Sequence, residues 1–90
     1  MPLDHPAVDA ALADLPGWTR EGAELVQVTK HGSFGPALTY VNAVGALAEA
    51  ANHHPDIDIR WDTVTLRLST HSEGGLTSKD LELAQQISRI

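Results

Sequence analysis

The sequence predicts an α+β fold, a two-layer sandwich with helices on one face of a four-stranded antiparallel sheet, in the order α-β-β-α-β-β-α. Two short segments, residues 57–61 and 64–70, alternate apolar and polar residues, which is typical of strands with one buried face, and two others, 18–20 and 23–30, have the composition of strands. Three other segments repeat apolar residues at spacings of three and four, which is typical of helices. The links within each strand pair are too short for crossovers, so they favour hairpins. At 90 residues, the chain is expected to form a single domain, 1–90.

The first third of the chain predicts a helix followed by a hairpin. Asp4 can cap the helix, and Pro16-Gly17 ends it. Residues 18–20 and 23–30 then have the composition of strands, with a tight turn at Glu21-Gly22 between them.

A long central helix is predicted between Ser33, a suitable cap, and Pro55, which disfavours helical geometry in the residue before it. Its small side chains would allow a close approach by another segment. Apolar residues recur along it as one expected stripe: Phe34, Leu38, Val41, Gly45 and Ala48.

The last third predicts a second hairpin and a final helix. Residues 57–61 alternate, which places Trp61 on the apolar face of a strand, and residues 64–70 continue the pattern after a turn. Thr77 and Asp80 have the spacing of a capping box at the start of the last helix.

Composition narrows the classes of function. Twelve acidic against six scattered basic residues give a formal charge of −6, which argues against a nucleic-acid partner. The chain has no cysteine for disulfides or thiolate metal sites, and no apolar run of membrane-spanning length. We expect a cytoplasmic protein with no membrane partner. The small core and an exposed sheet edge also predict association with further copies of the chain.

Three of the five histidines mark the candidate site. His53 and His54 lie at the end of the predicted central helix, and His71 follows a predicted strand. Imidazole titrates near neutral pH, so this group suits proton transfer. A single histidine at a helix end could instead simply interact with the helix dipole. A metal site is a weaker alternative, because helical metal-binding pairs usually lie four residues apart.

Other polar or aromatic residues near these histidines have two interpretations each. Glu49, one helical turn before His53, is either a solvated acid or a carboxylate that binds a ligand ring. Trp61 is either a core residue or the border of a flat ligand. Asp80 is favoured as a structural capping acid.

Together these residues resemble the signature of the pterin-4a-carbinolamine dehydratases. The matching motifs are Glu49-x-x-x-His53-His54-Pro55, Trp61, Ser69-Thr70-His71 and Asp80. Leu15-Pro16-Gly17-Trp18 and Gly75-Leu76-Thr77 are also similar, so the resemblance covers nearly the whole chain.

The resemblance implies loss of water from 4a-hydroxytetrahydropterin to give quinonoid dihydropterin. It implies catalysis by His53, His54 and His71, with no metal and no cofactor, since the pterin is the substrate. It also implies a homodimer or homotetramer, and a functional link to an aromatic amino-acid hydroxylase. Which histidine is acid and which is base stays open. The implied pterin-binding residues are Glu49, His53, His54, Pro55, Trp61, Thr70, His71 and Asp80.

The chain also departs from the family pattern. Asn52 stands where many members have Asp, and Glu73-Gly74 stand where others have Cys and Ala. The alternative function is a pterin-binding or protein-assembly module of the same fold without significant catalysis. Three intact histidines favour the enzyme, because a scaffold needs no cluster of titratable groups.

Overall fold

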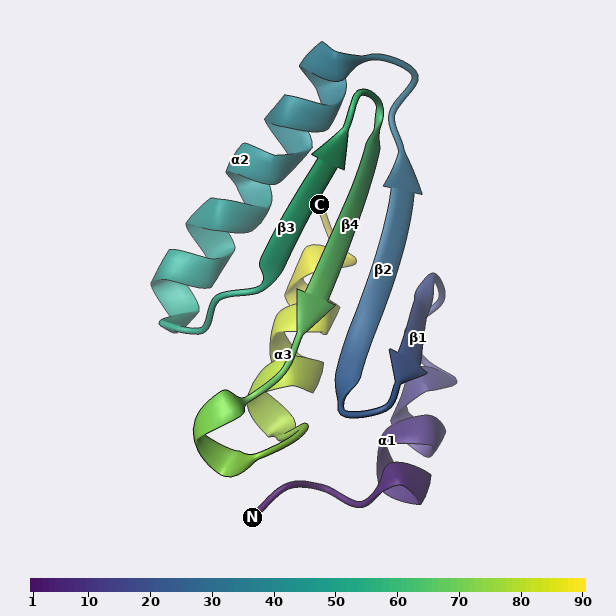
Figure 1. The fold of residues 1–90 in the computed structure, drawn as a ribbon, viewed down its shortest axis with the longest axis vertical. Coiled ribbons are helices and arrows are strands. Elements are labelled where there is room, and N and C mark those ends of the chain that lie inside the picture. The colour runs from purple at the N-terminus through teal and green to yellow at the C-terminus, as the bar shows by residue number, and fades with distance from the viewer.

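The computed structural model describes residues 1–90 and confirms the predicted order of elements (Figure 1). A short 3-10 turn, His71–Glu73, lies between the last strand and the last helix. The helices and strands are α1 His5–Leu12, β1 Trp18–Glu21, β2 Glu24–Lys30, α2 Phe34–Ala51, β3 Asp56–Arg60, β4 Thr63–Leu68 and α3 Ser78–Ile87.

The four strands form one antiparallel sheet in the order β1-β2-β4-β3. Two hairpins, β1–β2 and β3–β4, are joined side by side through β2 and β4. The two central strands belong to different hairpins. The helix α2 connects the first hairpin to the second. The two edges of the sheet are therefore β1 and β3.

The helices lie on one face of this sheet, as predicted. Along β4, Val64, Leu66 and Leu68 are fully buried, whereas the alternate residues Thr65 and Arg67 are only partly buried. The buried residues of β4 join one apolar cluster with side chains of all three helices, including Val8, Val44 and Leu83. Alternation along the strand thus separates a core face from an open face.

The buried face of α2 differs from the predicted stripe. Its fully buried residues are Ala37, Val44 and Ala48, whereas Phe34 and Leu38 are 49% and 41% exposed. Small residues face the sheet because they allow the helix backbone to approach it closely. Two large side chains that were expected on the buried stripe consequently lie on the surface.

Trp61 is the clearest departure from the predicted elements. Arg60 pairs with Thr63, so the β3–β4 turn consists of Trp61 and Asp62, and Trp61 is not a strand residue. It has a φ of 53° and is 65% exposed, so the interpretation as a core residue is wrong. A bulky residue rarely adopts a positive φ, and nothing in the alternating pattern indicated one.

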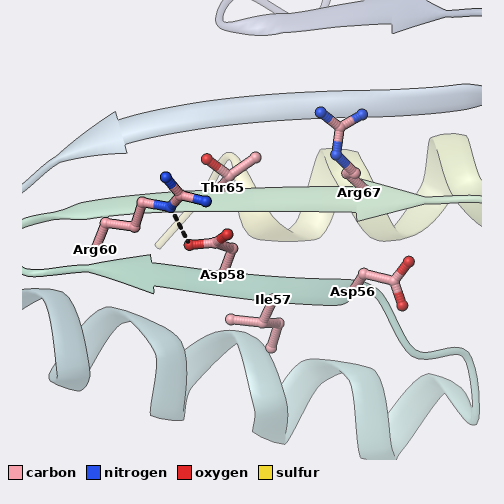
Figure 2. A pocket seen from close by; sticks show the side chains of 6 residues that line it. All are labelled: Asp56, Ile57, Asp58, Arg60, Thr65 and Arg67. Carbon is pink, nitrogen blue, oxygen red and sulfur yellow. Dashed lines mark ion pairs between the residues drawn. The ribbon is translucent and has the colours of Figure 1, made fainter.

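The open face of the sheet carries a shallow hollow of about 490 Å³, formed largely by charged side chains (Figure 2). Arg60 pairs with Asp58 at 3.4 Å. Arg67 donates to both Glu21 and Glu24, and the hydrogen bond to Glu21 is the main cause that raises the pKa of Arg67. These neighbouring charges are largely paired with one another.

A second hollow, of about 500 Å³, is lined by residues of β2, by one residue of α2 and by the C-terminal end of α3. Its wall includes Tyr40, whose hydroxyl donates to the Gln27 side-chain oxygen at 2.5 Å. Burial raises the pKa of Tyr40. None of the helices has both the length and the apolar character needed to cross a membrane.

Candidate active site

The backbone at the end of α2 sets the positions of both neighbouring histidines. The helix ends at Ala51, and Asn52 adopts a left-handed conformation with φ 50° and ψ 43°. The His53 amide donates to the Ala48 carbonyl, and the Asn52 amide donates to the Glu49 carbonyl. These two bonds form a Schellman motif, in which asparagine is the commonest substitute for glycine. His53 and His54 therefore leave the helix in directions that helical spacing does not predict.

His53 points toward the start of α3. Its Nε2 lies 2.6 Å from the Asp80 Oδ1 atom. The His53 side chain is 12% exposed, and that of Asp80 is completely buried. A hydrogen bond between residues 27 positions apart thus joins the end of α2 to the beginning of α3.

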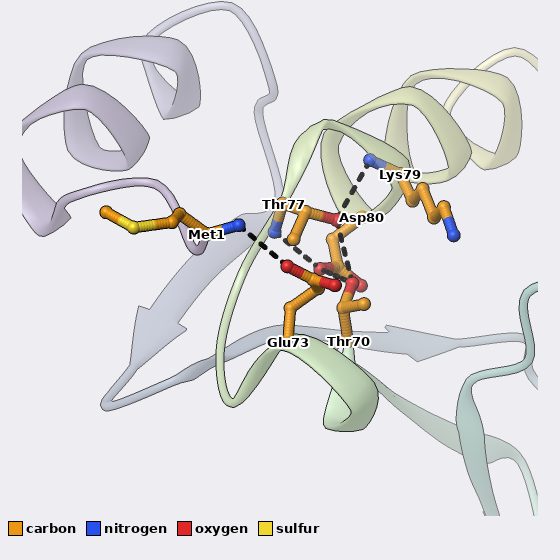
Figure 3. A network of polar contacts seen from close by, with 6 residues as sticks. All are labelled: Met1, Thr70, Glu73, Thr77, Lys79 and Asp80. Atoms are coloured by element: carbon orange, nitrogen blue, oxygen red, sulfur yellow. Dashed lines mark hydrogen bonds and ion pairs between the residues drawn. The ribbon is translucent and has the colours of Figure 1, made fainter.

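Asp80 is held from its other side by the segment that leads into α3 (Figure 3). Its Oδ2 accepts hydrogen bonds from the Thr77 amide at 2.9 Å and from the Thr70 hydroxyl at 2.7 Å. The Thr70 and Thr77 hydroxyl oxygens are themselves 2.8 Å apart. The predicted capping box is present, and the capping acid also contacts a candidate catalytic histidine.

His54 has a different partner in an exposed setting. Its Nε2 lies 2.9 Å from Glu49 Oε1, and the two side chains are 55% and 79% exposed. Glu49 was expected to share a face with His53, but it pairs with His54 instead. The left-handed Asn52 ends the helical periodicity on which that expectation depended.

His71 begins the 3-10 turn directly after Thr70 and is exposed. Backbone hydrogen bonds between Thr70 and Gly75 close the loop that carries it. Thr70 donates to Asp80, and Asp80 contacts His53. The residue directly before His71 is therefore connected to His53 through one carboxylate. At the end of the same loop, Glu73 accepts a hydrogen bond from the Met1 amino group at 2.7 Å, which lowers the pKa of Glu73 (Figure 3).

The structure does not bring Trp61 to this group. Pro55 lies between His54 and the start of β3, whereas Trp61 lies beyond the other end of that strand. At about 3.3 Å per residue, the strand separates them by roughly 20 Å. Neither hollow is lined by His53, His54 or His71. His54 and His71 are exposed, whereas His53 is largely buried.

The arrangement suits proton transfer on a bound molecule. His53 is held by a buried carboxylate, while His54 and His71 are accessible to a ligand. No three histidine or carboxylate side chains are arranged to hold a metal ion. Sequence reasoning favoured Asp80 as a capping acid, and the structure shows both that role and a contact with His53. The Thr70 hydroxyl was the available signal, since a polar residue after a buried strand needs a partner.

Comparisons with known proteins identify the family of this chain. The family model described as pterin 4 alpha carbinolamine dehydratase matches residues 1–90. Two relatives assigned by name as pterin-4-alpha-carbinolamine dehydratases come from Roseiflexus castenholzii and Nocardia farcinica. They are 53% and 51% identical over 98% of this chain, which corresponds to 95% and 93% of their own lengths.

Solved structures give the same result. The crystal structure of a transcriptional coactivator/pterin dehydratase from Brucella melitensis has a TM-score of 0.93 at 26% identity, covering 99% of this chain and 97% of that one. A pterin dehydratase-like RuBisCO assembly factor of the alpha-carboxysome, at 19% identity and a TM-score of 0.64, covers 80% of this chain and 83% of its own, and shares the fold. With its full length matched, this chain belongs to the pterin 4 alpha carbinolamine dehydratase family.

Proposed function

We propose that this chain dehydrates 4a-hydroxytetrahydropterin to quinonoid dihydropterin. The family match and the relatives of about half identity support the reaction class. The observation in the structure that carries the proposal is the hydrogen bond between His53 and the completely buried Asp80. An imidazole held by a buried carboxylate at the surface of a fold is suited to general acid–base work.

The reaction needs one proton donor and one proton acceptor, and no change of oxidation state. The bond between carbon 4a and its hydroxyl breaks, and the hydroxyl leaves as water after it gains a proton. The N–H bond at nitrogen 5 also breaks, and its electron pair forms the double bond between nitrogen 5 and carbon 4a. Imidazoles that titrate near neutral pH can serve at either end of this elimination.

The accessible residues are proposed to hold and serve the pterin. His54 and Glu49 lie where a ligand can reach both, and Glu49 can accept a pair of hydrogen bonds from the pterin ring. His71 is exposed on the loop after Thr70. The substrate is chemically the product of a pterin-dependent hydroxylation, so an aromatic amino-acid hydroxylase is the proposed source.

The decisive experiment follows the decay of enzymatically generated 4a-hydroxytetrahydropterin by absorbance, with and without the purified chain. We expect the chain to accelerate the decay in proportion to its concentration, and treatment with a chelator to leave the rate unchanged. A decay rate that stays uncatalysed at micromolar protein would contradict the proposal. It would favour a pterin-binding or assembly module, which equilibrium binding of a stable dihydropterin would then detect.

We also propose that the protein is a homodimer or homotetramer. Phe34 and Leu38 on α2 are exposed, and so is Ile57 on the edge strand β3, which Figure 2 shows pointing toward α2. A second copy would cover these apolar side chains and the free edge of the sheet. Light scattering at micromolar concentration is expected to give a multiple of the 9.6 kDa chain mass. A mass that stays at a single chain would contradict this.

A further inference from the structure

We infer that Thr70 is a positioning residue: through Asp80, its hydroxyl fixes the tautomer of His53 and so makes His53 Nδ1 the proton acceptor of the reaction. The inference deepens the proposed dehydration and rests on it for the identity of the proton that is moved. It is carried by the hydrogen-bond network around Asp80 and by the one open nitrogen of His53.

The donors around Asp80 can be assigned one by one. The Thr77 amide can only donate, so Oδ2 accepts from it. The Thr70 hydroxyl has one hydrogen and lies 2.7 Å from Oδ2 and 2.8 Å from Thr77 Oγ1. In the arrangement that satisfies every group, Thr77 donates to Thr70 and Thr70 donates to Asp80. The carboxylate then accepts at every bond.

This assignment determines where the proton of His53 resides. An ionised carboxylate has no hydrogen to give, so the contact between Oδ1 and Nε2 requires a hydrogen on Nε2. The neutral ring therefore carries its hydrogen on Nε2 and its lone pair on Nδ1. The carboxylate, fixed by two further donors, cannot easily turn away from the ring.

The remaining nitrogen of His53 is accessible from outside. Nδ1 makes no hydrogen bond within the protein, and the protein has no buried side-chain nitrogen or oxygen atom that lacks a partner. Nδ1 therefore reaches the surface, although the side chain as a whole is 12% exposed. A base with its lone pair outward and its N–H held inward is ready to take the proton from nitrogen 5. The acid that protonates the leaving hydroxyl then has to be one of the exposed histidines, His54 or His71.

Substitutions at Thr70 and Asp80 can test the effect of the hydrogen bonds on His53 separately from the effect of side-chain packing. Thr70→Val keeps the shape of the side chain but removes the donor to Asp80, and Thr70→Ser keeps the hydroxyl. Asp80→Asn turns an amide N–H₂ toward His53 and favours the opposite tautomer, with the hydrogen on Nδ1. Thr65→Val, on the open face of β4, is the matched control because its hydroxyl makes no hydrogen bond within the protein.

Two measurements are made on each variant. Nitrogen-15 NMR of the histidine rings reports the tautomer without any substrate, and single-turnover dehydration across pH reports catalysis. We expect wild type, Thr70→Ser and Thr65→Val to show the Nε2–H form of His53. We expect Thr70→Val to show a mixture and about tenfold lower turnover, and Asp80→Asn to show the Nδ1–H form and a loss of about 100-fold or more.

The tautomer is a readout that a merely structural role would not move. Without the Thr70 donor, Asp80 Oδ2 is held by the Thr77 amide alone and the carboxylate can turn relative to the ring, so Thr70→Val loses the single tautomer while Thr70→Ser keeps it. Unchanged tautomers and turnover in Thr70→Val and Asp80→Asn, with an active wild type, would overturn the inference alone. An inactive wild type would instead overturn the proposed function, while the NMR result would still decide the tautomer.

Discussion

Two adjacent histidines of this protein, His53 and His54, each contact a carboxylate, and the two pairs differ in almost every other respect. His53 and Asp80 are 2.6 Å apart, with side-chain exposures of 12% and 0%. His54 and Glu49 are 2.9 Å apart, with exposures of 55% and 79%. The first pair is enclosed by the fold, whereas the second is surrounded by water.

The difference shows that sequence neighbours can be given separate tasks by one backbone feature. Asn52 turns the chain out of the helix, so His53 contacts Asp80 at the start of α3 and His54 contacts the exposed Glu49. A pair in water contributes little to stability, because solvent screens it and both side chains lose freedom. The enclosed pair is fixed before any ligand arrives. We therefore expect the enclosed pair to govern turnover, and the exposed pair to govern binding.

The largest expected effect comes from removing the proposed base together with one candidate acid. His53→Ala combined with His71→Ala should lower single-turnover dehydration to near the uncatalysed rate, since each positioned group contributes about 10²- to 10⁴-fold. Each single substitution should retain part of the activity, because water or another imidazole can partly replace the lost group. Circular dichroism should show that the double variant is folded. A folded double variant with the wild-type rate would refute the assignment.

The next largest expected difference between the two pairs is in their contribution to the free energy of unfolding. Asp80→Ala removes the acceptor of the Thr77 amide and of the Thr70 hydroxyl inside the protein, so the free energy of unfolding should fall by about 2 kcal/mol or more. The matched change at the exposed pair, Glu49→Ala, should alter it by less than about 0.5 kcal/mol. Urea unfolding of both variants checks the prediction. Equal losses would show that burial does not distinguish the two pairs.

For substrate binding, we expect the exposed pair to matter more than the enclosed pair. Glu49→Gln keeps the size of the side chain but weakens its acceptors, so we expect KM for the pterin to rise several-fold with little change in kcat. A fall in kcat with constant KM would mean that Glu49 acts in the chemical step instead.

The smallest effect concerns a half-buried polar pair that has no part in the site. Burial raises the pKa of Tyr40 above its ordinary 10.0, so its contribution to stability is complete below about pH 10 and is lost as pH rises through the folded-state value. Tyr40→Phe cannot ionise, and its stability should decline less above that pH. Thermal unfolding of both proteins from pH 8 to pH 11 makes the comparison. Parallel curves would contradict it.

The fold was predictable because its signals are local. Alternation in β4, the proline after the central helix and the Thr77–Asp80 capping box each mark an element within a few residues. The pairing inside the candidate site was not predictable in the same way. The contact of Asp80 with His53 depends on how two helix ends meet, and helical spacing assigned Glu49 to the wrong histidine.

The position of Trp61 was also not predictable from the sequence pattern. A two-residue turn with a positive φ left no trace in the alternating pattern, so the residue was assigned to the strand and its core. The buried stripe of α2 was misplaced for a related reason, since periodicity cannot tell whether small or large residues will face the sheet.

The two tryptophans differ strongly in exposure, so their fluorescence can report two different events in the same protein. Trp18 is 4% exposed and its indole N–H donates to Ser88, whereas Trp61 is the exposed residue of the hairpin turn. Trp61 should emit at longer wavelength and be quenched by iodide, and Trp18 should emit at shorter wavelength and resist quenching until the chain unfolds. With Trp61→Phe as the reference, the same sample can report unfolding in one spectral region and any contact at the β3–β4 turn in the other.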